Sequence, residues 1–244
     1  MPTHATRPSR LKRVLLKLSG EAFCEKGGFG VESRAIGHIA REVADAAKAG
    51  AQVAVVVGGG NIIRGATLAE GGLLDQAVTD HMGMLGTVIN GLALREALEH
   101  EGCAARCMSA VPMPSVAEPF IRLRAIRHME KGRVVILAGG TGNPFFTTDS
   151  AAALRAAELG CDAVLKATKV DGVYSADPKK DPKATRYSGL TFAEAIEKRL
   201  KIMDMTALAL CQERRMPVLV FDFDRAGNIR KAVEGGDVGT MIRV

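Results

Sequence analysis

The sequence predicts an α/β fold, a three-layer α/β/α sandwich around a mainly parallel sheet of about eight strands. Short apolar runs alternate with segments of helical periodicity along the 244 residues, which is the pattern of strands joined by crossover helices. Aromatic residues make up only 4% of the chain, and small and aliphatic residues dominate, as suits parallel strands covered on both faces. Several strand-like runs also end in glycine-rich turns, where a strand leads into a helix.

The individual elements follow from these runs in chain order. Strands are expected over residues 13–18, 51–57, 104–110, 133–138, 162–167 and 217–223, with a short strand over 239–244. Helices are expected over 33–49, about 76–101, 117–131 and 149–159, where apolar residues recur at helical spacing. Thr191 and Glu194 match a capping box and predict a further helix start. The tract 169–189, with its two Asp-Pro dipeptides, predicts a long loop or small hairpin, either functional or a simple surface excursion.

The chain is expected to form one domain over residues 13–244, preceded by a basic, flexible tail over residues 1–12. Its length fits one large or two small α/β domains, but no repeat, low-complexity segment or linker separates two halves. Four of the six net positive charges fall in the first thirteen residues, which leaves only two for the rest of the chain. A basic tail does not make a nucleic-acid-binding surface, so no dedicated nucleic-acid partner is expected.

The cysteine pattern and the hydropathy predict a protein of the reduced cytoplasm. The five cysteines are scattered, with no CxxC pair and no secretory leader, which disfavours both a disulfide framework and a zinc site. The longest apolar runs have the length of strands, so no membrane span is expected. The acid-free N-terminus is only faintly similar to a transit peptide, because the first strand follows it at Arg13.

Three glycine-rich turns each follow a predicted strand: KLSGEA at 17–22, GGGNIIRG at 58–65 and GGTGNPFFTTD at 139–149. Turns at the carboxyl ends of strands in one sheet line a single edge, where open α/β sheets bind ligands. Glycine lets backbone amides approach phosphate oxygens, and Thr147 or Thr148 is expected to cap the following helix. The GxxxxGK[ST] pattern is absent and Ile63 interrupts a GxGxxG register, which disfavours P-loop kinases and Rossmann dehydrogenases.

Charged residues beside these turns predict phosphoryl transfer, which needs cations around the migrating group and little covalent chemistry. Each lysine alone is also explained by a solvated charge at a strand end, and each acid by a helix cap or a turn. The shared position of the lysines at strand ends favours the functional interpretation. His81 is expected to be structural, and no cysteine has a base near it in sequence. The candidate cations are Lys17, Arg64, Lys166 and Lys169, and the candidate acids are Asp80, Asp149, Asp177 and Asp204.

KLSGEA, GGGNIIRG, DHMGMLGTVINGLAL, GTGNPFFTTDSAA and KATKVDGVYSADP, in this order and spacing, resemble the bacterial uridylate kinases of the amino-acid kinase superfamily. The likeness covers residues 13–244, and DHMGMLGT together with GTGNPFFTTD is its specific part. The resemblance implies an amino-acid kinase-like fold and transfer of the γ-phosphoryl group of ATP to UMP, with Mg²⁺, in pyrimidine nucleotide biosynthesis. It also implies a homohexamer that UTP inhibits and GTP activates.

Carried over position by position, the resemblance also implies site residues. Tyr174 stands where many relatives have Phe and is expected to border the adenine. Arg95 and Arg106 match basic residues of the family's GTP site, whereas Glu99 stands where some relatives have His. No protein metal ligand is expected, because nucleotide phosphates would hold most of the Mg²⁺ shell. The implied ATP-binding residues are Lys17, Leu18, Ser19, Gly20, Gly60, Arg64, Thr168, Tyr174 and Asp177. The implied UMP-binding residues are Gly59, Asp80, Thr141, Gly142, Asn143, Pro144, Phe145, Phe146, Thr147 and Thr148.

The residues and the resemblance together predict direct in-line transfer. Two lysines would neutralise charge on the moving phosphoryl group, two acids would orient the lysines or the metal, and Gly59 and Gly60 would supply amide donors. Asp80 is expected to accept hydrogen bonds from the ribose hydroxyls, and residues 144–146 to form an apolar wall beside the nucleoside. The expected catalytic residues are Lys17, Lys166, Asp149 and Asp204.

Two other functions remain open on the sequence. One is a phosphotransferase on the same scaffold that acts on an amino-acid carboxylate or a carbamate, which should lack the DHMGMLGT and NPFFTTD combination. The other is a nucleotide-binding regulator or storage protein that has lost catalysis. Such a protein is expected to have lost Lys17, Asp149 or Lys166, and this chain retains all three.

Overall fold

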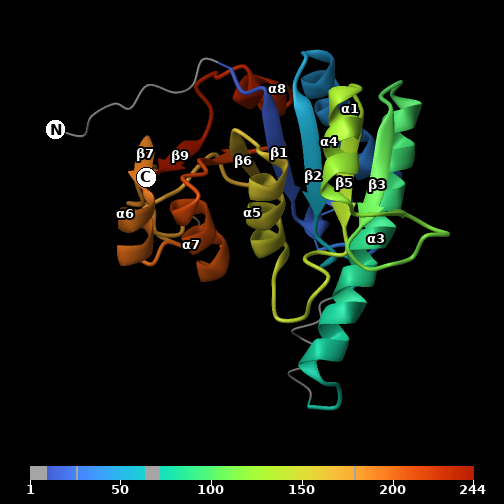
Figure 1. Cartoon of the computed structure of the whole chain (residues 1–244). Helices are drawn as coiled ribbons and strands as arrows, with labels where there is room; N and C mark the ends of the chain where they lie inside the picture. Colours follow the sequence, from blue (N-terminus) through green and yellow to red (C-terminus); the bar gives the residue numbers. More distant parts are fainter. Residues whose placement is uncertain (1–9, 26, 64–71, 179) are drawn as a thin grey trace.

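The computed structural model of the protein describes residues 10–25, 27–63, 72–178 and 180–244. Its centre is a nine-stranded sheet in the order β4-β3-β5-β2-β1-β6-β8-β9-β7 (Figure 1). Neighbouring strands pair in parallel except for β8 and β9, which are antiparallel. The strands are β1 (Arg13–Leu18), β2 (Gln52–Val57), β3 (Ala105–Ser109), β4 (Glu118–Pro119), β5 (Val134–Ala138), β6 (Ala163–Thr168), β7 (Gly189–Thr191), β8 (Val218–Asp222) and β9 (Thr240–Arg243).

Helices cover both faces of this sheet, which confirms the predicted α/β/α layering. One apolar core lies between the sheet and α1, α3 and α8, and a second lies between the sheet and α4, α5, α6 and α7. The helices are the 3₁₀ turn η1 (Gly20–Phe23), α1 (Ser33–Lys48), α3 (Gln76–His100), α4 (Arg122–Glu130), α5 (Thr148–Leu159), α6 (Phe192–Glu197), α7 (Met205–Glu213) and α8 (Asn228–Val233). Across the described residues, none of these helices has both the length and the apolar character that a membrane crossing requires.

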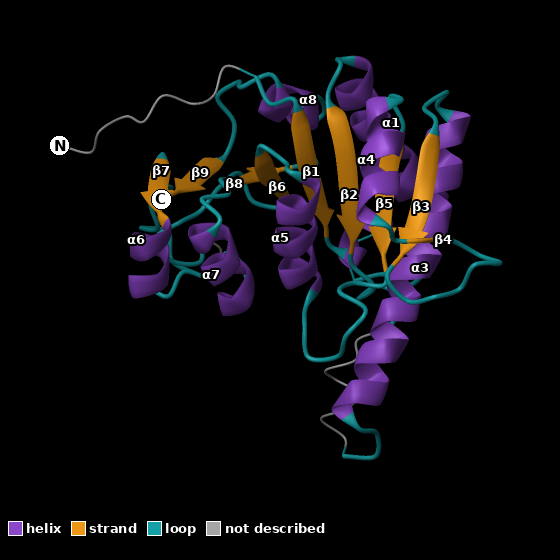
Figure 2. Cartoon of the chain, in the orientation of Figure 1, coloured by secondary structure: helices purple, strands orange, loops and turns teal. Residues whose placement is uncertain are grey.

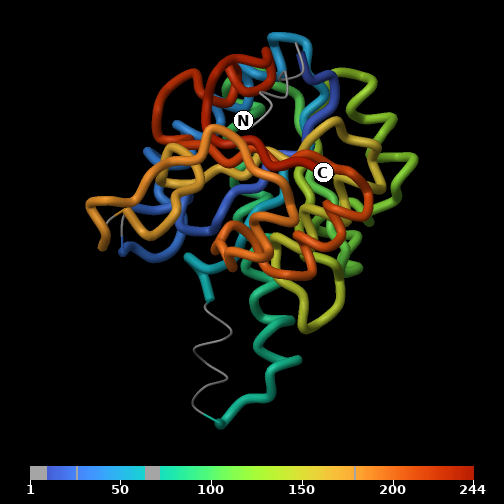
Figure 3. Tube along the Cα trace, turned by 90° about the vertical axis from the view of Figure 1, so that its left-hand side faces the viewer, coloured from blue at the N-terminus to red at the C-terminus, as the bar shows by residue number. Residues whose placement is uncertain are grey.

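The central strands β3, β5, β2 and β1 all end at the same edge of the sheet, as their arrowheads show (Figure 2). The helix α3 extends well past this edge, and its first half stands away from the body of the molecule in both views (Figures 1 and 3). The carboxyl edge is therefore flanked by one long helix on one side and by the start of α5 on the other. The predicted glycine-rich turns fall at this edge because each directly follows β1, β2 or β5.

The structure confirms all seven predicted strands and most of the predicted helices, with two differences. The helix expected over 117–131 begins only at Arg122, because Glu118 and Pro119 pair with β3 as the short strand β4. The short elements β7, α7 and α8 were not predicted. The tract 169–189 is an irregular loop in which Tyr174 and Arg186 form one isolated antiparallel bridge.

The last residues of the expected basic tail contact the body of the protein. Leu11 is buried and donates its backbone N–H to the carbonyl of Val233 at 2.8 Å. The backbone N–H of Lys12 donates to Asp162 Oδ2 at 2.6 Å, just before β1 begins. Residues 10–12 are therefore packed against the fold, because an apolar side chain and two backbone groups find partners there. The remainder of the predicted tail, residues 1–9, lies outside the described residues.

Candidate active site

Two lysines lie side by side on the central strands at the carboxyl edge. Lys17 in β1 and Lys166 in β6 are register partners of the parallel pair. Successive side chains of a strand alternate between its faces, and Leu16 and Leu165 pack into the core beneath α1. The two lysines therefore point to the opposite face, toward the start of α5. Strand register and side-chain alternation together bring two positive charges next to each other.

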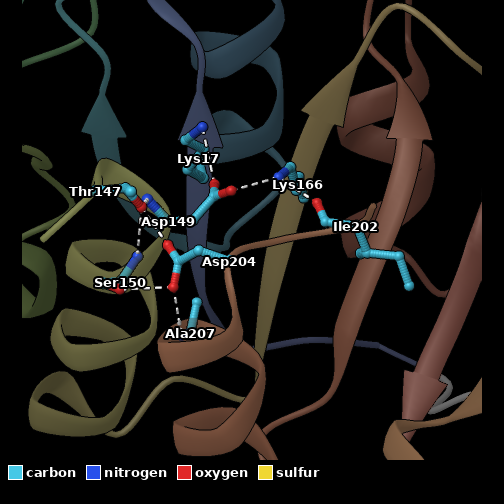
Figure 4. Close-up of polar contacts among 8 residues, drawn as sticks. All are labelled: Lys17, Thr147, Asp149, Ser150, Lys166, Ile202, Asp204 and Ala207. Carbon is cyan, nitrogen blue, oxygen red and sulfur yellow. Dashed lines mark hydrogen bonds and ion pairs between the residues drawn. The ribbon is translucent and has the colours of Figure 1, made fainter. Parts of the chain in front are cut away.

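Asp149, in the first turn of α5, lies between these two ammonium groups (Figure 4). Its Oδ1 is 2.9 Å from Lys17 Nζ, and its Oδ2 is 2.6 Å from Lys166 Nζ. Lys166 also donates to the backbone carbonyl of Ile202. The side chains of all three charged residues are no more than 15% exposed. One carboxylate thus binds two cations in a largely buried position, which leaves a net positive charge facing the edge of the sheet.

The electrostatic environment shifts the pKa values of this cluster. Burial acts to raise the pKa of Asp149, but the ammonium groups of Lys17 and Lys166 outweigh it, and the pKa lies below its ordinary value of 3.8. Burial lowers the pKa of Lys166 below its ordinary value of 10.5, and the nearby Asp149 offsets this effect only in part. Asp149 is therefore ionised at neutral pH, and its carboxylate holds both lysines in place through ion pairs.

The lowered pKa of Asp149 predicts a specific acid dependence of stability. Because the folded state binds this proton less readily than the unfolded state, the stabilisation is complete above pH 3.8 and disappears as the pH falls through the folded-state value. We expect the Tm difference between the native chain and Asp149→Asn to stay constant between about pH 5 and pH 7 and to shrink below pH 3.8. Thermal unfolding of both proteins across this range measures it. A difference that is independent of pH down to acid unfolding would contradict the ion-pair geometry.

A second carboxylate, Asp204, lies beside this cluster and serves as the N-cap of α7. It accepts hydrogen bonds from the backbone N–H of Ala207 at 2.8 Å, from the hydroxyl of Ser150 at 2.9 Å and from the hydroxyl of Thr147. Thr147 is itself the N-cap of α5, as the sequence predicted, and accepts from the N–H groups of Asp149 and Ser150. Asp204 therefore ties the start of α7 to the start of α5, and its direct hydrogen bonds go to these groups and not to the lysines.

The first two glycine-rich turns pack tightly against each other beside Lys17. A Cβ atom on Gly20 would lie 2.6 Å from the backbone nitrogen of Gly60, and one on Gly58 would lie 2.6 Å from the nitrogen of Gly20. The backbone N–H of Gly58 also donates to the carbonyl of Leu18 at 2.8 Å. Only glycine permits this approach, so the backbones of the two turns lie directly against each other after the strand that carries Lys17. This arrangement suits the binding of phosphate oxygens.

The third turn, residues 139–148, reaches toward α3. Phe145 has a φ angle of 70°, unusual for a residue other than glycine, and its backbone N–H donates to Asp80 Oδ2 at 2.7 Å. Gln76 binds the other oxygen of Asp80 at 2.8 Å. The side chains of Phe145 and Phe146 are 74% and 50% exposed. Asp80 therefore holds the loop in its conformation, while the two aromatic rings remain available to a ligand.

The remaining predicted site residues lie beside the end of β6. Thr168 is its last residue and donates its hydroxyl to the carbonyl of Val170 at 2.8 Å. The hydroxyl of Tyr174 donates to Asp171 at 2.6 Å. Asp177 is exposed in the loop that follows. Arg64, the remaining predicted ATP-binding residue, lies outside the described residues.

The structure also contains a pocket away from this edge, at the far end of α3. It has a volume of about 350 Å³, and Arg95, Glu99, Arg106 and Glu118 contribute to its lining. The guanidinium of Arg106 lies 3.4 Å from Glu99 and 3.7 Å from Glu118. The two arginines that the sequence singled out thus come together, and both are already paired with acids, since Arg95 lies 3.7 Å from Glu96.

Burial explains why the cysteines are poor nucleophiles. All five are buried and none forms a disulfide. Burial raises the pKa of Cys107 to about 11 and those of Cys161 and Cys211 to about 12. Within the described part of the chain, no group of three or more His, Cys, Asp or Glu side chains is arranged to hold a metal ion.

An α/β sheet with glycine turns and paired lysines at one edge is typical of proteins that bind phosphorylated ligands. The chain belongs to the amino acid kinase family, whose model matches residues 12–222. It is 41% identical to a UMP kinase from Bacillus anthracis, with 96% of each chain covered and a TM-score of 0.92. It is 37% identical to a UMP kinase from Ureaplasma parvum over 96% of this chain and 100% of that chain, with a TM-score of 0.90. A uridylate kinase from Archaeoglobus fulgidus is 31% identical over 94% of this chain and 99% of that chain, with a TM-score of 0.73. The resemblance seen in the motifs is confirmed.

Sequence reasoning missed several side chains that build this edge. Ser150 was not predicted, although the Asp-Ser pair after Thr147 lies in the first turn of a helix, where hydroxyl groups commonly bind neighbours. Thr87 and Asn90 were also missed, because a polar residue on a helix is ordinarily expected to face water, and so was Asn61, because a polar residue in a turn is expected to do the same. All three are buried. A signal was present in the spacing of Thr87 and Asn90, which places two polar residues on one side of α3.

Proposed function

We propose that the protein transfers the γ-phosphoryl group of ATP to UMP, giving ADP and UDP, as a step of pyrimidine nucleotide biosynthesis. The observation that carries the proposal is the Lys17–Asp149–Lys166 cluster beside three glycine-rich turns at one sheet edge. The similarity to UMP kinases along nearly the whole chain supports the choice of substrates. An amino-acid or carbamate kinase is less consistent with these relatives, and a regulator without catalysis is less consistent with the complete cluster.

The first glycine turn and the end of β6 would bind ATP. Lys17 and Leu18 end β1, Ser19 and Gly20 form the turn after it, and Gly60 packs against Gly20. Thr168 ends β6, which pairs with β1, and Tyr174 and Asp177 follow in the next loop, where the ring of Tyr174 would border the adenine. Backbone amides in the glycine turns would donate to phosphate oxygens. The cations of the cluster would then lie next to the terminal phosphate.

The third glycine turn would bind UMP, together with Gly59 of the second. The hydroxyls and amides of Thr141, Asn143 and Thr148 offer donors for a phosphate. The exposed rings of Phe145 and Phe146 offer an apolar surface for the nucleoside. Asp80 would accept from the ribose hydroxyls, and its existing bond to the Phe145 amide couples this contact to the shape of the loop.

The chemistry requires no general base. A phosphate monoester with a second pKa of about 6 is largely dianionic at neutral pH, so a UMP phosphate oxygen can attack the γ-phosphorus directly. The new bond forms as the bond to the β,γ-bridging oxygen breaks, and ADP leaves with that electron pair. Lys17 and Lys166 would stabilise the negative charge on the transferring group, and Asp149 would hold both ammonium groups in place.

Magnesium would reach this site on the nucleotide. Both oxygens of Asp149 are occupied by lysines, and those of Asp204 by hydroxyl and amide donors, so the cluster offers no open set of hard oxygen ligands. Mg²⁺ is commonly bound through substrate phosphates with few protein ligands. The ATP phosphates would hold it, and it would neutralise charge on them.

Assembly as a homohexamer is supported by the exposed surface of α3. Val78, Leu85 and Ile89 are 51%, 50% and 48% exposed and recur at helical spacing on a helix that projects from the body of the molecule. Exposed apolar side chains gathered on one helix face are typical of subunit contacts.

We propose that residues 13–244 act as one domain within such an assembly. The cytoplasmic location stays a prediction.

Regulation by nucleotides is proposed for the pocket at the far end of α3. Arg95 and Arg106 supply cations that suit the phosphates of GTP, while Glu99 competes for Arg106 at 3.4 Å. UTP, as a product analogue, is proposed to inhibit at the UMP site.

We expect Glu99→Gln to lower the GTP concentration for half-maximal activation by about threefold or more, because Arg106 is released toward the ligand. Steady-state rates at increasing GTP measure this, with Glu197→Gln, an exposed acid of α6 outside the pocket lining, as the control. An unchanged or higher half-activating concentration would contradict the assignment.

The acceptor is tested by coupled ADP release with ATP and Mg²⁺, comparing UMP, CMP, dTMP, acetylglutamate and carbamate. We expect strong turnover with UMP and weak or no turnover with the others. Turnover with acetylglutamate or carbamate would instead assign the protein to another branch of the family. No turnover with any acceptor, together with tight binding of ATP or UTP, would assign it as a nucleotide-binding regulator.

A further inference from the structure

Three polar side chains are buried in the interior near the sheet edge, outside the cluster of lysines and acids. Thr87 and Asn90 of α3 are 2% and 0% exposed, and Asn61 of the second glycine turn is 3% exposed. Burying a polar group costs free energy unless hydrogen bonds replace its water. The partners of these side chains therefore indicate why polar residues occupy these positions.

Asn90 and Asn61 form a reciprocal pair of amides. The Nδ2 of Asn90 donates to Oδ1 of Asn61 at 2.7 Å, and the Nδ2 of Asn61 donates back to Oδ1 of Asn90 at 3.0 Å. Asn90 also donates to the carbonyl of Gly58 at 2.7 Å, and Asn61 to the carbonyl of Gly30 at 2.6 Å. The pair thus holds Gly58 and Asn61 of the second glycine turn against α3.

Thr87, one helical turn before Asn90, holds the third glycine turn in the same way. Its hydroxyl accepts a hydrogen bond from the backbone N–H of Gly139 at 2.7 Å and donates to the carbonyl of Met84 at 2.6 Å. Gly139 begins the third turn and has a φ angle of 75°, so its backbone is already in a conformation that favours glycine. The hydroxyl thus provides a hydrogen-bond acceptor for the N–H of Gly139 and holds the first residue of the turn against α3.

The backbone of the second turn also lies directly on α3. A Cβ atom on Gly59 would lie 2.5 Å from the carbonyl oxygen of Gly83 and 3.0 Å from the nitrogen of Thr87. No side chain therefore separates the helix from the turn. The same short stretch of α3 contacts the second turn through Gly83, Thr87 and Asn90, and the third turn through Thr87.

We propose that Thr87 and Asn90, with Asn61, are positioning residues that set the second and third glycine turns in the relative geometry that phosphoryl transfer requires. This inference rests on the proposed function, in which Gly60 contacts ATP and Gly59 and the third turn contact UMP. None of the three side chains touches the lysine cluster through its hydrogen bonds. They act by holding the backbone groups that would bind the two nucleotides, because small misplacements of such groups slow transfer strongly.

The hydroxyl of Thr87 is tested with a matched pair of variants. Thr87→Val keeps the shape of the side chain but removes the acceptor for Gly139, whereas Thr87→Ser keeps the hydroxyl. We expect Thr87→Val to lower kcat/KM for UMP by about tenfold or more, with the KM for ATP changed by less than about twofold. Thr87→Ser should retain kcat/KM for UMP within about threefold of the native value. A loss that is the same in Val and Ser, or absent in both, would overturn the role of the hydroxyl.

Asn90 is tested with Asn90→Leu against a control on the same helix. Leu98→Ala removes buried apolar volume about two turns away, where the side chain belongs to the core between the sheet and α1, α3 and α8. We expect both variants to lower Tm, but only Asn90→Leu to lower kcat, by about tenfold or more, and to raise the KM for both substrates. Equal kinetic losses at equal loss of Tm would show that Asn90 is merely structural. If Asn90→Leu does not fold, the Thr87 pair decides the proposal.

The proposed function and the positioning role of Thr87 and Asn90 are contradicted by different results. A native protein without UMP-dependent ADP release would overturn the proposed function, whatever the variants do. An active native protein whose Thr87→Val variant is as active as Thr87→Ser, and whose Asn90→Leu variant loses no more than Leu98→Ala, would overturn only the positioning role.

Discussion

Replacing Lys17 by Met is expected to lower kcat by about a thousandfold while the chain keeps its fold. The ammonium group would act on charge that develops in the transition state, and Met has a similar length without that charge. The fold should survive because Asp149 keeps Lys166 as its partner at 2.6 Å, so the cluster changes from two cations and one anion to a balanced pair. Steady-state kinetics with UMP and thermal unfolding measure both effects.

A lysine at the other end of β1 provides the control for this change. Lys12 is exposed and precedes the strand, far from the carboxyl edge, so Lys12→Met removes the same charge without touching the cluster. We expect Lys12→Met to retain kcat within about twofold. If Lys17→Met turns over as fast as Lys12→Met, Lys17 has no part in the chemistry.

Replacing Asp149 by Asn is expected to damage stability and activity together. Lys17 and Lys166 are register partners, and without the carboxylate two largely buried ammonium groups would face each other uncompensated. Removing one partner of a buried ion pair costs about 3–5 kcal/mol, so we expect a clear drop in Tm. Loss of lysine orientation should lower kcat by about a hundredfold or more. The pKa of Lys166 should also fall further, because Asp149 partly offsets the effect of burial, and any residual activity should be lost at lower alkaline pH.

The double variant Lys17→Met/Asp149→Asn separates these two effects. It removes one cation along with the anion, so the repulsion between the lysines disappears and part of the lost Tm should return. Activity should not return, because the positive charge beside the transferring group is still missing. A single Asp149→Asn variant with native Tm would show that the carboxylate is not needed to hold the lysines. Recovery of activity in the double variant would contradict the catalytic assignment of Lys17.

Much of the fold and the heart of the site could be predicted because they depend on local patterns. The runs RVLLKL and DAVLKA each place a lysine on the side of a strand opposite to its neighbours, and TTD marks the start of a helix. The two-residue strand β4 could not be predicted, since its pairing with β3 depends on contacts that sequence periodicity does not encode. The distance between the two lysines also depends on the register of β1 against β6, whose strands lie far apart in the chain.

The supporting contacts of the site were the least predictable part. Asp204 looked like a residue that orients the lysines, but its hydrogen bonds go to Thr147, Ser150 and the start of α7. The spacing of Thr87 and Asn90 placed them on one side of α3 but did not reveal their role, because what they bind is backbone of distant turns. Tertiary packing decides such partners, and a single sequence carries little information about it.

The most direct test of the account is to follow ATP, UMP and Mg²⁺ with the native protein by phosphorus NMR. We expect UDP and ADP to form in equal amounts, as their phosphorus signals report, and inorganic phosphate not to accumulate. Release of inorganic phosphate without UDP would mean that the lysine cluster hydrolyses ATP and does not transfer its phosphoryl group to UMP. An unchanged spectrum, with both nucleotides bound, would contradict catalysis by this site altogether.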